Sequence, residues 1–212
     1  MNSHLKFIAF LLVFTFFSCK KDNTFTEYKF ADNGIVLTCD NVNSKLYSEA
    51  LFSFEKDILD FYGKSRPNSS QIQAYSQFIR TAIGGRTKYE DIVSAHTIKV
   101  FEALKNETNL WDANNQKSHL NYNSPLIKCI SNNIKNKDLK ITLNSLLTTN
   151  SMSSRLFGSP LLSNYRNIAS DKYLATYVAF DLFYAKLFDI DLTTIDFVKT
   201  ETKVDFNKIP EK

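Results

Sequence analysis

Three ionisable residues lie within runs of apolar residues, where an unpaired charge is costly. His96 lies between Tyr89 and Val100 on the apolar face of one expected helix, and Asp57 and Asp181 have similar positions in two others. A buried carboxylate without a partner costs several kcal/mol or takes up a proton. We therefore expect each of these three groups to have a partner inside the fold.

A helical bundle can bring such side chains together from separate helices. His96 with Asp57 or Asp181 would then form an acid/base pair or a pair of metal ligands. The alternative, which we favour, is a core histidine hydrogen-bonded to a carboxylate or a tyrosine hydroxyl. The sequence contains no G-x-S-x-G, phosphate-binding loop, H-E-x-x-H or C-x-x-C motif. We therefore expect no metal and no cofactor, and we favour a non-enzymatic role over an enzymatic one.

A long polar segment, residues 106–123, is a second candidate for function, since long loops often bind ligands or move. It contains Trp111 beside Asp112, whereas most other aromatic residues have the spacing of a core. Trp111 is therefore expected to be free to stack on a small ligand or a glycan.

Cys39 and Cys129 are separated by a long stretch of chain. In an oxidising compartment they would be able to form a disulfide, and the alternative is two buried free thiols. The sequence leaves both interpretations open.

The N-terminus has a short cationic start with Lys6, an apolar run FIAFLLVFTFF, and Ser18-Cys19. The run is too short to cross a bilayer as a helix, so it predicts a secretory signal. Its end, FFSC, resembles the lipobox of bacterial lipoproteins. Ser18 and Cys19 match the lipobox, whereas two phenylalanines replace its usual Leu and Ala or Ser.

The resemblance implies that residues 1–18 are removed and that Cys19 is acylated and anchors the chain in a membrane. Two or more acyl chains hold a protein stably. Lys20, rather than Asp, follows the cysteine. By resemblance to lipoprotein sorting this favours the outer membrane, with the periplasmic or surface face left undecided.

The remaining chain is predicted to form one all-α domain. The full sequence is 43% hydrophobic with only five Gly and four Pro, and its formal charge of +4 without an arginine-rich block gives no sign of nucleic-acid binding. We expect a flexible tether over 19–33, a bundle of five to six helices over 34–190 and a polar tail over 191–212. The expected helices cover residues 41–62, 70–83, 87–104, 125–135, 138–149 and 171–189, with 150–160 as a loop.

These observations favour a membrane-anchored envelope lipoprotein that binds a protein partner without catalysis. The alternatives are an envelope enzyme with a buried His/Asp site and a lipoprotein that binds a small ligand or glycan.

Overall fold

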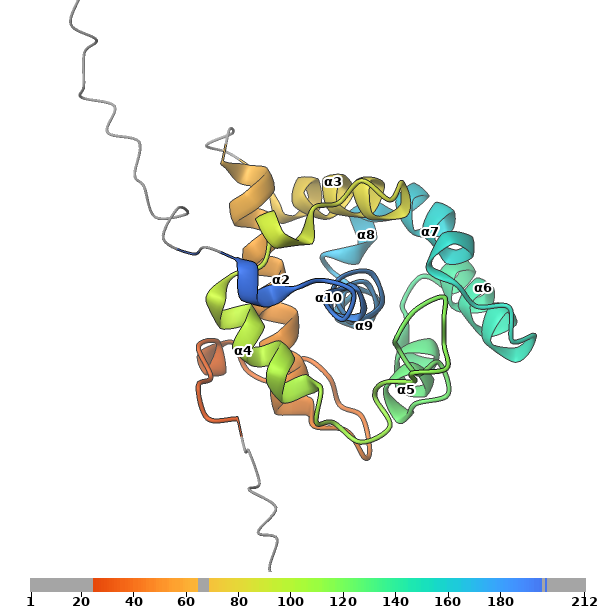
Figure 1. Cartoon of the computed structure of the whole chain (residues 1–212). Helices are drawn as coiled ribbons and strands as arrows, with labels where there is room; N and C mark the ends of the chain where they lie inside the picture. Colours follow the sequence, from red (N-terminus) through yellow and green to blue (C-terminus); the bar gives the residue numbers. More distant parts are fainter. Residues whose placement is uncertain (1–24, 65–68, 196, 198–212) are drawn as a thin grey trace, which may run out of the picture.

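The computed structural model describes residues 25–64, 69–195 and 197. Its helices form a ring around one central helix, and Figure 1 looks along the axis of that helix. The predicted all-α class is confirmed: the described residues contain no named strand. The central helix consists of α9 (Lys172–Tyr177), the π-helical segment η4 (Val178–Tyr184) and α10 (Ala185–Leu187) in direct succession.

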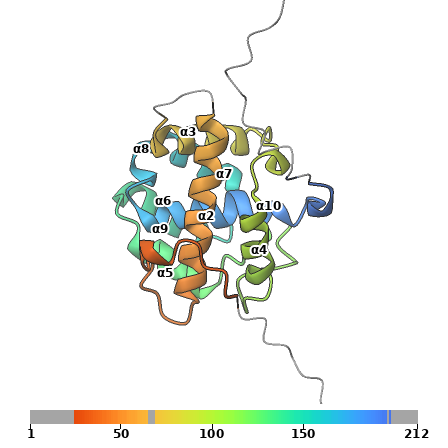
Figure 2. The same cartoon turned by 90° about the vertical axis from the view of Figure 1, so that its left-hand side faces the viewer.

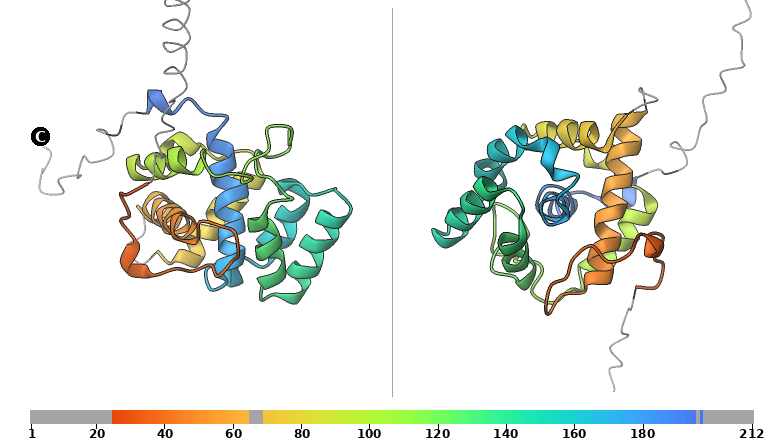
Figure 3. Two further views of the ribbon diagram at one scale, coloured as in Figure 1. Left: turned by 90° about the horizontal axis from the view of Figure 1, so that it is seen from below. Right: turned by 180° about the vertical axis from the view of Figure 1, so that it is seen from behind.

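The surrounding helices follow one another around this axis, as the view from behind also shows (Figure 3). The long helix α2 crosses the central helix, and Figure 2 shows this crossing from the side of α2. The bounds of the ring are α2 (Ser44–Gly63), α3 (Gln71–Ile83), α4 (Ala95–Leu104), α5 (Pro125–Asn133), α6 (Lys137–Thr148), α7 (Ser154–Ser163) and α8 (Tyr165–Ile168). Single turns of 3-10 helix lie at η2 (Ala31–Asn33), η3 (Tyr89–Asp91) and η5 (Leu192–Thr194).

The central position of the last helix follows from its composition. Between Leu174 and Leu187 every residue except Lys186 is buried, in line with the nearly uniform apolar character of this segment. Asp171 caps its N-terminus by accepting a hydrogen bond from the Leu174 N–H. The π-helical turns in its middle are wider than α-helical turns and are frequent at functional sites.

Local capping signals locate most of the helix starts. Ser124 caps α5, as predicted, and Ser70 forms a capping box with Gln73 at the start of α3. The prediction that the helix of 87–104 begins at Thr87 was wrong. The chain there makes the turn η3, and α4 begins only after the cap Ser94.

The prediction of a loop over 150–160 was wrong, because α7 occupies Ser154–Ser163. Gly158, a residue type that is common in loops, lies buried within this helix. A Cβ atom at this position would come within 2.6 Å of Ile83 Cγ1 on α3, so glycine allows the two helices to approach closely. The glycine therefore serves packing and does not interrupt the helix.

The predicted tether, 19–33, is not free over its whole length. Phe25 packs against the core, and the N–H groups of Lys29 and Phe30 donate hydrogen bonds to Glu49 on α2. Residues 19–24 lie outside the described part of the chain. Of the predicted tail, 191–212, the side chains of Leu192 and Ile195 are half-buried against the core.

Candidate functional site

His96 lies in the core, as predicted, but its partner is Glu49. His96 Nε2 is 2.6 Å from Glu49 Oε1, a geometry in which the imidazole N–H donates to the carboxylate. The two side chains are only 5% and 1% exposed. The rings of Phe25 and Phe30 lie 6.3 and 6.0 Å from the imidazole and cover it on the side of the N-terminal segment.

Glu49 is the residue that the sequence reasoning missed, because on a helical wheel it lies opposite the apolar face of α2, with Lys45, Lys56 and Asp60. Its carboxylate also accepts hydrogen bonds from the backbone N–H groups of Lys29 (2.7 Å) and Phe30 (3.0 Å). The segment that supplies these donors was predicted to be a tether. The apolar residues Phe25 and Phe30 within it were the available signal that it packs on the domain.

Asp57 accepts a hydrogen bond at the N-terminus of α4. Its Oδ2 accepts a hydrogen bond of 3.0 Å from the Ser94 N–H, at the end of the helix where N–H groups lack partners. Burial raises the pKa of Asp57 from 3.8 to about 6, although hydrogen bonds from Thr97 and Ser94 act in the opposite direction. Asp57 therefore joins two helices, α2 and α4.

Asp181 lies in the π-helical segment and is completely buried. The hydroxyl of Tyr177 donates to its Oδ2 at 2.6 Å, and the hydroxyl of Tyr122 donates to its Oδ1 at 2.9 Å. Burial raises the pKa of Asp181, against the lowering effect of the hydrogen bonds from Tyr177, Ser118 and Tyr122. Asp181 thus attaches the 106–123 loop to the central helix.

The three residues therefore belong to three separate arrangements. Among the described residues, no hydrogen bond joins His96 to Asp57 or to Asp181, and the hydrogen-bonded partner of His96 is Glu49 instead. No group of three or more His, Cys, Asp or Glu side chains within the described ranges is placed to hold a metal ion. The hydrogen bonds of these buried groups join helices and segments that are far apart in the sequence.

Trp111 is half-buried and is not free to stack on a ligand. Its indole N–H donates to the Leu104 carbonyl at 2.7 Å, and its ring packs against Phe180 and Phe188. An antiparallel bridge joins Trp111 to Leu120, so the long loop is a folded hairpin. The ring of Trp111 thus packs against the core around the central helix.

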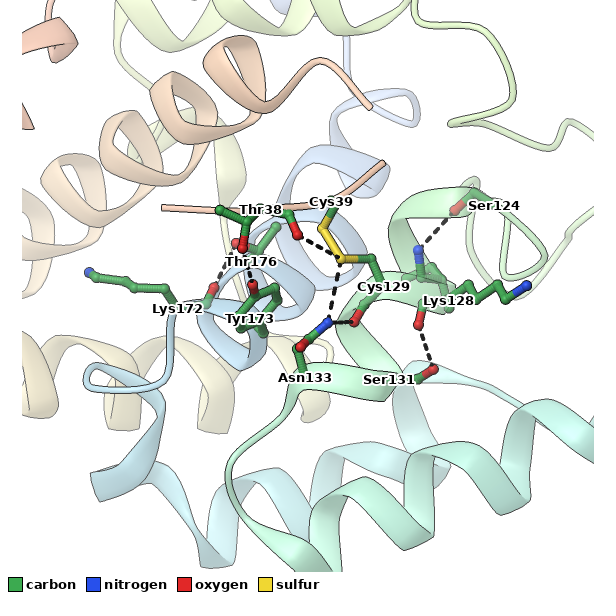
Figure 4. The surroundings of a disulfide bond; sticks show 11 residues. Thr38, Cys39, Ser124, Lys128, Cys129, Ser131, Asn133, Lys172, Tyr173 and Thr176 are labelled. Atoms are coloured by element: carbon green, nitrogen blue, oxygen red, sulfur yellow. Dashed lines mark hydrogen bonds between the residues drawn. A yellow bond between two sulfur atoms is a disulfide. The ribbon is translucent and has the colours of Figure 1, made fainter. Parts of the chain in front are cut away.

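Cys39 and Cys129 form a disulfide, shown in Figure 4. Their Cα atoms are 5.8 Å apart, and the bridge joins the extended segment before α2 to α5. Beside it, the hydroxyls of Thr38 and Tyr173 are 3.1 Å apart, which ties the same segment to the central helix. The sequence left open whether these cysteines are free or paired, and in the structure they are paired.

The predicted lipidation site, Cys19, lies outside the described residues. Within the described ranges, no helix combines the length and the apolar character needed to cross a membrane.

Two surface hollows of the described part of the molecule are of a size that could hold a ligand. One, of about 730 Å³, is lined only by residues of α6 and its C-cap Thr149, so no other helix contributes to its lining. The other, of about 390 Å³, lies where several elements meet and includes Lys117, Arg155 and Lys186.

Fold and site together describe an all-α domain with one disulfide, whose buried ionisable groups are used to hold its elements together. Comparison of the chain with protein-family models, with curated proteins and with solved structures finds no match.

Proposed function

We propose that this chain is a lipid-anchored envelope protein that acts by binding and does not catalyse a reaction. The observation that supports this most is the enclosure of the His96–Glu49 pair. A catalytic base must reach the proton that it removes. His96 is covered by aromatic rings, and its hydrogen bond to Glu49 is a structural one.

The disulfide supports an envelope location, because such bonds persist in oxidising compartments and are rare in the cytosol of mesophiles. The lipobox-like sequence that ends at Cys19 supplies the proposed anchor. Lys20, rather than Asp, follows this cysteine, which favours sorting to the outer membrane. Because Phe25 already packs on the domain, the chain between Cys19 and Phe25 spans about 20 Å at most when fully extended. The domain would then be held close to the membrane surface, where we propose that it meets a protein partner.

Labelling with a clickable fatty acid tests the anchor. The wild-type chain should be labelled and should sediment with membranes, and the Cys19→Ser variant should lose both properties. A Cys19→Ser chain that still carries the label would refute acylation at this residue.

Chemical modification tests whether His96 is enclosed, with His119 of the same molecule as an internal control. The side chain of His119 is 33% exposed and that of His96 is 5% exposed. Diethyl pyrocarbonate should therefore modify His119 much faster than His96, as measured by peptide mass spectrometry. Equal rates would indicate a water-accessible cleft at His96 and would favour the enzyme alternative.

A further inference from the structure

Three cationic side chains from three separate segments converge on one cavity. Lys117 comes from the 106–123 loop, Arg155 from the first turn of α7, and Lys186 from the end of the central helix. The cavity of about 390 Å³ falls in the range of sites that bind compact organic ligands. Figure 3 shows the loop passing close to the central helix on the side of α7.

Carboxylates outside the lining balance the three cations in part: besides burial, the charges of Asp181 and Asp189 raise the pKa of the lining residue Tyr89. None of the cavity's described lining residues is acidic, and within the described chain neither Lys117 nor Arg155 has a carboxylate within 4.0 Å. Lys186 has one carboxylate at 4.0 Å, that of Asp189, which also accepts a closer contact of 2.8 Å from His119.

Burial raises the pKa of Asp181 and the charge of Lys186 acts in the opposite direction, but Asp181 is fully buried and hydrogen-bonded to Tyr122 and Tyr177. Like charges that share a cavity repel one another, and an anion bound between them would remove that repulsion.

The rest of the lining suits an anionic group attached to an apolar body. Ser153, Ser154 and Tyr89 add polar side chains to the lining, and the Ser153 hydroxyl also caps α7 by accepting from the Leu156 N–H. Ala82, Ile83 and Leu182 supply an apolar surface in the same cavity. The Lys117 backbone is fixed by a hydrogen bond of 3.2 Å from its N–H to Asn115 Oδ1, so this cation is presented by an ordered turn.

We propose that this cavity binds the phosphate or sulfate group of a compact organic molecule, with Lys117, Arg155 and Lys186 as its cationic contacts. Arg and Lys form the strong, charge-assisted hydrogen bonds by which proteins hold such oxyanions. The apolar residues would contact the organic part of the ligand. These contacts would make the organic phosphate or sulfate bind more tightly than the inorganic ion. This inference rests on the proposed binding function and names the ligand class that such a protein would take.

Phenyl phosphate is a suitable probe, because it combines the oxyanion with a small apolar ring. Titration of the full chain in a non-ionic detergent, followed by calorimetry, should give tighter binding of phenyl phosphate than of inorganic phosphate. Phenol should not bind. Phenyl sulfate and inorganic sulfate, measured in the same way, distinguish the two oxyanions.

Arg155→Gln and Lys117→Gln should each weaken phenyl phosphate binding by about tenfold or more, because each removes a charge-assisted contact. Both residues are exposed, so neither substitution disturbs the core. Lys128→Gln is the matched control, since Lys128 is an exposed lysine on α5 outside the cavity, and it should bind as wild type does.

Affinities of the Arg155→Gln and Lys117→Gln variants equal to that of Lys128→Gln would overturn the proposal. Binding of phenol as tight as that of phenyl phosphate would also overturn it. Acylation of Cys19 and enclosure of His96 are measured separately, so a failure here leaves the proposed function open to its own tests.

Discussion

Glu49 accepts hydrogen bonds from the His96 ring and from two backbone N–H groups of the N-terminal segment. Its side chain is 1% exposed, so water cannot replace any of these partners. The buried carboxylate therefore holds α2, α4 and the segment around Lys29 together. The contribution of Glu49 to the free energy of unfolding can be measured by substituting it.

We expect Glu49→Ala to lower the free energy of unfolding by about 3–5 kcal/mol, because it leaves a buried imidazole and two N–H groups without an acceptor. Urea denaturation measures this change. Asp60→Ala is the control on the same helix, because Asp60 is exposed and contacts only Lys56 among its described ion pairs. Its effect should stay within about 1 kcal/mol. Similar losses for the two variants would contradict a structural role for Glu49.

Asp57 predicts a dependence of stability on pH. Its pKa in the fold is about 6, above its ordinary value of 3.8, because burial disfavours the ionised form. The folded state therefore binds the proton more tightly, and the contribution of Asp57 to stability falls as pH rises between about 4 and 6.

Asp57→Asn removes this titration but keeps an oxygen that can accept from the Ser94 N–H. Relative to wild type, the variant should gain stability as pH rises from 4 to 7, by about 3 kcal/mol at most. Urea midpoints of both proteins at several pH values give this difference. A difference that is constant with pH would show that Asp57 has an ordinary pKa in the fold.

At the scale of elements, helix starts were predicted best where a capping residue precedes an apolar run. Ser70, Ser124 and Asp171 all accept the N–H bonds that such positions require. The α7 helix was missed because Gly158 and Pro160 are common in loops. Their role here is set by α3, whose Ile83 packs against Gly158.

We expect Gly158→Ala to destabilise the protein by about 1–3 kcal/mol, because the added methyl group overlaps Ile83. This sign is opposite to the intrinsic preference, since alanine favours a helix over glycine by about 1 kcal/mol. Thermal unfolding measures the effect, with the exposed neighbour Ser159→Ala as control. A stabilised Gly158→Ala variant would mean that α3 and α7 are not in close contact.

At the scale of the whole molecule, the ring of helices is connected by one covalent link across a sequence separation of 90 residues. The bridge between Cys39 and Cys129 joins the segment that enters α2 to α5, on either side of the central helix (Figure 4). Closing so long a loop restricts the unfolded chain considerably.

Loss of the disulfide should lower the free energy of unfolding by about 4–5 kcal/mol in the chain-entropy model. The comparison is best made in the Cys19→Ser background, where no acyl chain is attached. A reductant should lower the melting temperature of this protein, and it should have no effect after the further substitutions Cys39→Ser and Cys129→Ser. Equal melting temperatures with and without reductant would contradict the bridge.

The sequence by itself determined the all-α class, most of the helix starts and the central place of the last helix, because periodicity and capping are local properties. It also showed that His96 and Asp181 would be buried. Which residues they meet was decided by the tertiary structure alone.

Glu49 and His96 are 47 residues apart, and Tyr122 and Asp181 are 59 apart. The convergence of Lys117, Arg155 and Lys186 likewise depends on three separate segments. The packing of helices in space determines such contacts. The spacing of residues within one helix does not predict them.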